Sequence, residues 1–116
     1  MSRLEKLRSR YLKDPIPMRL GGLAANLARV ASFSKHDGHQ HAVSATIAES
    51  KWFIEWTAND LDVEQTAELV RLQSQLARWE LQSRNSWNDE KWRQELLRSS
   101  QQWSEQLIKM SGLATS

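Results

Sequence analysis

VSATIAESKWFIEWTA, residues 43–58, is a helix-like run that is apolar on two separate faces. At about 100° per residue, one arc of this helix contains Val43, Ile47, Ser50, Phe53, Ile54, Thr57 and Ala58. The opposite arc contains Ala45, Ala48, Trp52 and Trp56. Because apolar helix faces are normally buried, a helix with two such faces requires a partner on each side. The pattern predicts the central helix of a small bundle.

Length and composition indicate a folded globular protein. The chain has 116 residues, of which 40% are hydrophobic and 26% charged, so we expect a single helical domain over residues 1–116. The absence of cysteine excludes disulfides and thiolate metal sites. No apolar run approaches the roughly 20 residues of a membrane span, and the first residues are charged, unlike a signal peptide. We therefore expect a cytoplasmic protein.

Hydrophobic periodicity and breaker residues predict an all-α fold. A short basic N-terminal helix, about 2–13, should stop before Pro15, which disfavours helix at the preceding residue. Short connections then favour an antiparallel up-down four-helix bundle. Its helices are expected at about 17–34, 41–59, 62–84 and 88–111. A helical hairpin swapped into a homodimer is the alternative, because long helices with short loops allow both arrangements.

Two of the predicted helices have unusual faces. The helix at 17–34 has a row of small residues that would let another backbone approach closely: Gly21, Ala24, Ala25, Ala28 and Ala31. The helix at 62–84 has a second apolar face beside its main one, as an inner helix would: Val63, Val70, Ala77 and Leu81.

Polar and glycine residues mark the expected helix ends. Asp62 has the spacing of an N-cap, and Asn88 is predicted to cap the final helix. With that cap, Trp87 and Trp92 occupy the two positions of a hydrophobic staple. Gly112 is expected to end the final helix in a left-handed conformation.

Positive charge is concentrated in the first third of the chain. Residues 1–40 contain eight Lys and Arg against three Asp and Glu, whereas residues 41–116 contain eight against eleven. Four cations form a basic stripe at helical spacing: Arg3, Lys6, Arg10 and Lys13. Three interpretations stay open for this stripe: an ordinary solvated face, a surface for an acidic protein or the chain's own acidic end, and a surface for nucleic acid or anionic lipid. No helix-turn-helix signal accompanies it, so nucleic acid is possible but not favoured.

All three histidines lie close together, at the loop expected over residues 35–40. His36, His39 and His41 have imidazoles that suit zinc, copper or nickel if the loop folds back on itself. A polar loop without a metal, or one that responds to pH, explains the same residues. The hypothesis is metal binding by His36, His39 and His41.

Six tryptophans against two phenylalanines and one tyrosine are the most unusual feature of the composition. Trp52 and Trp56 lie one helical turn apart, with Ala45 and Ala48 before them on the same face. A pair of this size is usually buried in a core or an oligomer interface, because its area is large. The alternative is the floor of a groove for a ligand or a partner helix.

Catalytic patterns are not found in the sequence. It has no glycine-rich phosphate loop, nucleophile elbow or cysteine nucleophile, so we expect neither an enzyme nor a cofactor. The leading hypothesis is a protein–protein interaction or adaptor module that binds a partner protein or itself, as a homodimer. Its surface would combine the basic stripe with any apolar face left uncovered, such as that of Trp52 and Trp56. Nucleic-acid binding by the basic stripe and metal binding by the histidines are the alternatives.

Overall fold

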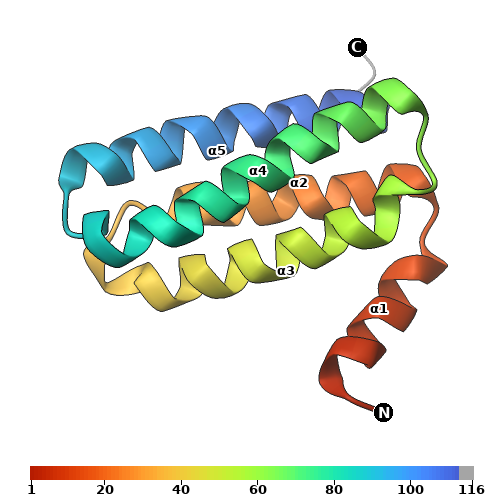
Figure 1. Cartoon of the computed structure of the whole chain (residues 1–116), viewed down its shortest axis with the longest axis horizontal. Helices are drawn as coiled ribbons and strands as arrows, with labels where there is room; N and C mark the ends of the chain where they lie inside the picture. The colour runs from red at the N-terminus through yellow and green to blue at the C-terminus, as the bar shows by residue number, and fades with distance from the viewer. Residues whose placement is uncertain (113–116) are drawn as a thin grey trace.

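The computed structural model describes residues 1–112, which form α-helices and one 3-10 turn and contain no strand (Figure 1). The helices are α1 (Arg3–Lys13), α2 (Ile16–Phe33), α3 (Gln40–Ala58), α4 (Val63–Ser86) and α5 (Glu90–Ser111), with the 3-10 turn η1 (Asp37–His39) before α3. The predicted all-α class is confirmed. The largest boundary differences are two residues, at the end of α4 and the start of α5.

The four long helices pack as a bundle, and α1 projects from one end of it (Figure 1). α2 packs on α3 and on α5, α3 packs on α4, and α4 makes a slighter contact with α5. The core between them is built from aliphatic and aromatic side chains of all four helices.

The pairing of α2 with α5 is the most extensive in the protein. Ala24 and Ala31 of α2 and Ser100 of α5 are buried, and the Ser104 hydroxyl donates to the Ala24 carbonyl at 2.8 Å. Because the distance between two helix axes depends on the side chains between them, small residues allow this close approach. We call Ala24, Ala31, Ser100 and Ser104 the α2–α5 seam. Of the five small residues named from the sequence, Ala24 and Ala31 are buried in this seam, whereas Ala28 is exposed.

The expectation that residues 43–58 form a central helix with both apolar faces buried is wrong, because α3 packs on α2 and α4 through one arc. α3 buries only one of its two apolar arcs: Val43, Ile47, Ser50, Phe53, Ile54 and Thr57. On the other arc Ala45, Ala48 and Trp52 are exposed. The physical reason is that each long helix packs on two others, and both long partners of α3, α2 and α4, lie against its buried arc.

Helix ends follow the sequence signals with one correction. The Asp62 carboxylate accepts a hydrogen bond from the backbone N–H of Gln65 at 2.7 Å, and Gly112 has a φ of 73°, as expected. The cap of α5, however, is Asp89 and not Asn88, which suits the helix dipole because Asp89 is charged. The staple positions therefore shift by one residue. Trp87 and Trp92 are still in contact edge to face, with ring centroids 6.4 Å apart.

Candidate interaction surface

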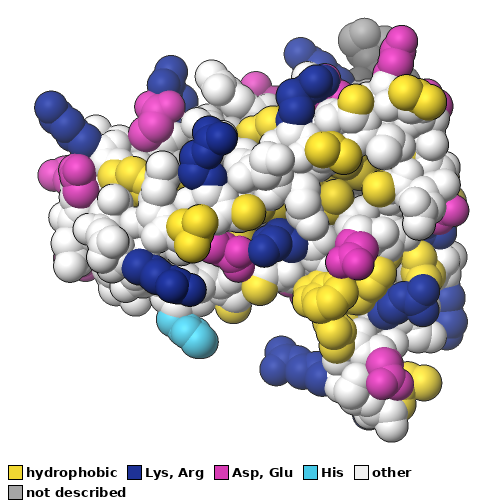
Figure 2. Space-filling view, in the orientation of Figure 1, with side chains coloured by type: hydrophobic (Ala, Val, Ile, Leu, Met, Phe, Trp, Pro, Cys, Tyr) yellow, Lys and Arg dark blue, Asp and Glu magenta, His cyan; other side chains and the backbone are white. Residues whose placement is uncertain are grey.

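The arc of α3 that points away from the bundle is the most distinctive surface of the protein. We call it the outer face of α3 and define it by His41, Ala45, Ala48, Trp52, Glu55 and Trp56. All of these residues are exposed except Trp56, which is half-buried. In Figure 2 the largest hydrophobic area on this side of the molecule lies where α3 meets α1.

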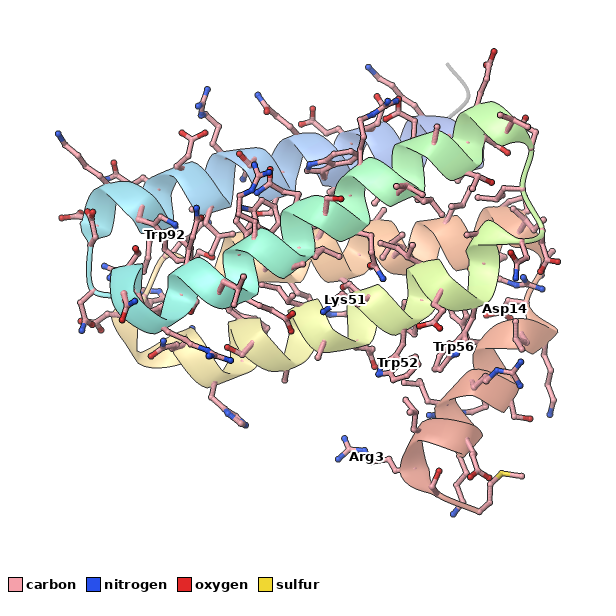
Figure 3. All side chains as sticks on the ribbon, in the orientation of Figure 1. Arg3, Asp14, Lys51, Trp52, Trp56 and Trp92 are labelled. Carbon is pink, nitrogen blue, oxygen red and sulfur yellow. The ribbon has the colours of Figure 1, made fainter. Side chains whose placement is uncertain are left out.

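Trp52 and Trp56 form a small aromatic shelf on this face. Their rings are stacked with centroids 5.8 Å apart, and Trp56 also contacts Phe53 and Tyr11. Trp52 has no such second layer and remains 40% exposed. Figure 3 shows both rings in the angle between α3 and α1. Burial of both tryptophans in the core, one of the two predicted placements, is therefore wrong for Trp52.

A single buried tyrosine holds α1 against the bundle. The Tyr11 ring stacks on Phe53 with centroids 4.0 Å apart. Its hydroxyl donates to the Arg19 carbonyl at 2.9 Å and accepts from the Thr57 hydroxyl at 3.1 Å. Burial raises the pKa of the Tyr11 phenol to about 12, an effect that the hydrogen bond from Thr57 opposes.

Arg19 fixes the turn between α1 and α2. Its guanidinium donates to the Asp14 carbonyl at 2.8 Å and to the Leu12 carbonyl at 3.2 Å. It also forms an ion pair with Asp60, in the turn between α3 and α4, at 2.8 Å. Since the residue before Pro15 is extended, α1 leaves the bundle at an angle, and Arg19 and Tyr11 stabilise that angle.

The basic stripe lies on the projecting helix. Arg3, Lys6, Arg10 and Lys13 are all exposed, and none forms an ion pair with a residue in the described part of the chain. Figure 3 shows the Arg3 side chain reaching from α1 into the angle in which Trp52 and Trp56 lie. Arg3, at the start of the stripe, therefore lies on the same side of the molecule as Trp52 and Trp56.

The histidines are only partly brought together. The rings of His36 and His39 meet edge to face with centroids 5.5 Å apart, and His39 also contacts Phe33. His41 instead lies on the first turn of α3, at the end of its outer face. Across residues 1–112, no group of three or more His, Cys, Asp or Glu is placed to hold a metal ion. The structure thus assembles a histidine pair and not the three-histidine ligand set.

A second apolar strip lies on α4 and is separate from the outer face of α3. Val63, Val70 and Leu81 are exposed, so the expectation that α4 is an inner helix with two buried faces is wrong. Between the two helices, the Lys51 ammonium donates to the Glu80 carboxylate at 2.7 Å. This ion pair places a polar border between the two apolar surfaces.

Sequence reasoning missed a polar link between α2 and α3. The buried Asn26 donates from its amide nitrogen to the Glu49 carboxylate at 2.9 Å and accepts from Arg29 at 2.7 Å. Asn26 lies among the apolar residues of α2, and an isolated polar residue on an apolar face was the available signal. This link satisfies Glu49, which borders the outer face of α3, and leaves Glu55 as the acidic residue on that face.

Comparisons with protein-family models, with curated proteins and with solved structures found no match. No helix among residues 1–112 has the length and apolar character that a membrane crossing requires.

Proposed function

We propose that this chain is a non-enzymatic protein–protein interaction module that self-associates through the outer face of α3. The observation that carries the proposal is the exposure of Trp52, 40%, on a face that also exposes Ala45 and Ala48. Tryptophan dominates the binding energy of many interfaces because it buries a large area at a small cost in conformational entropy. A contiguous exposed apolar patch is a usual mark of an interaction surface.

Local rigidity supports the proposal. Trp52 is held by its stack on Trp56, and Trp56 in turn contacts Tyr11 and Phe53. A side chain that is already ordered loses less conformational entropy on binding. The proposal treats α2 to α5 as an antiparallel up-down four-helix bundle, which the short connections at 59–62 and 87–89 favour. A reducing compartment such as the cytoplasm suits a chain without cysteine.

Sedimentation equilibrium across the micromolar range tests the proposal. The wild-type chain should show a monomer–dimer equilibrium, and Trp52→Ala should raise the dissociation constant by about 30-fold, which corresponds to about 2 kcal/mol. Leu81→Ala is the matched control, because it also removes an exposed apolar side chain, 65% exposed, but from α4. A wild-type chain that stays monomeric throughout, or equal effects of the two variants, would refute the proposal.

A second candidate function is nucleic-acid binding by α1. The specific observation in its favour is that the basic stripe lies on a projecting helix and has no ion-pair partner in residues 1–112. Four cations that neutralise phosphates would give a slope of about −3 to −4 in a plot of log K against log salt on duplex DNA. Such binding would be independent of sequence.

Titration with random duplex and with single strands at low and high salt tests this candidate. The double variant Arg10→Glu and Lys13→Glu should abolish binding. The control is Arg78→Glu with Lys91→Glu, which makes the same change in net charge at exposed positions of α4 and α5. No binding by the wild-type chain at low salt, or equal losses in both double variants, would exclude α1 as a nucleic-acid surface.

A further inference from the structure

We propose that the occupant of the outer face of α3 is the same face of a second copy, packed antiparallel about a two-fold axis at Ala48. The inference rests on the proposed function, and it adds the register and the orientation of the contact. It is argued from the shape and the charge of that face.

The face is complementary to itself in shape. Its one exposed large apolar side chain is Trp52, since Trp56 is half-buried, and the small Ala45 and Ala48 lie within two turns of it on the same helix. In packed helices, a knob from one helix inserts into a hole formed by four residues of the other, at spacing i, i+3, i+4 and i+7. The hole available to Trp52 of the second copy is formed by exposed residues: His41, Ser44, Ala45 and Ala48.

A two-fold axis satisfies both halves of this fit at once. An isologous interface uses the same patch on both copies, so each patch must contain a knob and a hole. With the axis at Ala48, Trp52 lies opposite Ser44 of the second copy, because both are four residues from the axis. Trp52 of each copy then fills the hole of the other copy, and the exposed apolar area of both aromatic shelves is buried.

The polar residues at the ends of the face agree with the same register. His41 and Glu55 are each seven residues from Ala48, so the axis places His41 of one copy opposite Glu55 of the other. Both side chains are exposed, and neither makes a hydrogen bond or an ion pair with a residue among 1–112. A parallel arrangement would instead place Glu55 against Glu55, and like charges in an interface are unfavourable. Charge thus selects the antiparallel orientation.

α1 borders the end of the outer face that contains Trp52 and Trp56. It meets α3 at Trp56 and Phe53, beside the last turns of the outer face, and projects away from the bundle (Figure 1). The rest of that face, from His41 to Trp52, is exposed. The stretch from His41 to Ala48, which forms the proposed hole, lies farther from α1 than the two tryptophans do (Figure 1).

Disulfide trapping of the full-length chain tests the register directly, because the protein has no native cysteine. For helix axes about 9 to 10 Å apart and Cα atoms about 2.3 Å from each axis, two Ala48 Cα atoms on the two-fold axis lie about 4.4 to 5.4 Å apart, within disulfide range. Ala48→Cys should therefore give a covalent dimer under mild oxidation. Ala67→Cys is the matched control, an exposed alanine on α4.

Orientation is tested by mixing two single variants, His41→Cys and Glu55→Cys. The antiparallel register predicts a mixed disulfide between them. It predicts no disulfide between two His41→Cys chains, since those positions are 14 residues apart along the paired helices, about 21 Å. Circular dichroism of each variant establishes that the fold is kept.

The outcomes separate this inference from the function on which it rests. Trapping at Ala48 together with the mixed disulfide supports both. A dimer in solution in which Ala48→Cys reacts no faster than Ala67→Cys, or in which His41→Cys chains link to each other, overturns the register and leaves the interaction module standing. A chain that is monomeric at every concentration overturns both.

Discussion

The α2–α5 seam and the outer face of α3 contain similar small residues, but the first is buried and the second is exposed. Both have small side chains at helical spacing, Ala24 and Ala31 on α2 and Ala45 and Ala48 on α3. The first pair is buried against α5, whereas the second pair is exposed. A row of small residues therefore indicates that a helix can be approached closely, but it does not say which helix approaches. In this protein one row is covered by the same chain and the other is left open.

Truncation of large side chains should separate the two regions most strongly. Leu27 is completely buried on α2, so Leu27→Ala should lower the free energy of unfolding by about 2 to 5 kcal/mol. Trp52→Ala should cost the dilute monomer only about 1 kcal/mol, chiefly its stack on Trp56. Urea denaturation at low protein concentration measures both. If Trp52→Ala were as costly as Leu27→Ala, the outer face of α3 would belong to the core.

The second-largest effect is expected at alkaline pH, which should weaken the packing of Tyr11 against α3. The folded pKa of Tyr11, about 12, is above the ordinary value of 10.0, so the neutral phenol is favoured in the folded state. The neutral phenol stabilises the fold fully below about pH 10. This stabilisation, about 2 to 3 kcal/mol in total, is lost as pH rises toward about 12. The stability difference between wild type and Tyr11→Phe, measured from about pH 9 to about pH 12, should shrink accordingly. Parallel curves for the two proteins would contradict this assignment.

Adding volume should distinguish the two rows of alanines. Ala24→Leu places extra methyl groups between α2 and α5 and should destabilise the protein by about 1 to 3 kcal/mol. Ala45→Leu is the matched change on the outer face and should alter monomer stability by less than about 0.5 kcal/mol. In the dimer, Ala45→Leu fills part of the hole proposed for Trp52 and should weaken association. Thermal unfolding and sedimentation measure the two effects, and equal destabilisation by both variants would show that the two rows are equally packed.

The smallest difference is expected at the serines. Ser104→Ala removes the hydroxyl that donates to the Ala24 carbonyl across the seam, whereas Ser44→Ala removes an exposed hydroxyl on α3. Helix propensity changes equally in the two variants, so it cancels in the comparison. Ser104→Ala should be the less stable by about 1 kcal/mol, the usual value of one hydrogen bond. Indistinguishable melting curves would mean that this hydrogen bond contributes nothing to the seam.

Local signals explain why the helices were predictable. Helix boundaries follow from caps and breakers that act within a few residues, such as Asp62 at the start of α4 and Gly112 after α5. The exception, Asp89 in place of Asn88, is an error of one residue between two neighbouring capping residues. The two apolar arcs of α3 and the small residues of α2 were also correct as patterns.

The candidate site was predictable in part. Periodicity placed Trp52 and Trp56 on one face and the basic stripe on another helix, but it gave no information about the distance between them. Their proximity depends on the turn at Pro15, on the burial of Tyr11 and on the contacts of Arg19 with Asp14 and Asp60. The three histidines are close in sequence but are not brought together in space. α3 starts between His39 and His41 and separates His41 from the other two.

The sequence by itself determined that this protein is helical, where its helices begin and end, and which residues share a face. These properties depend on backbone geometry and on periodicity, which act over a few residues. Only the tertiary structure decided which helices pack on α3 and that its second arc is open. The physical reason is that each apolar face competes for a limited number of partners. α2 pairs most extensively with α5, and both long partners of α3 lie on the side away from Trp52.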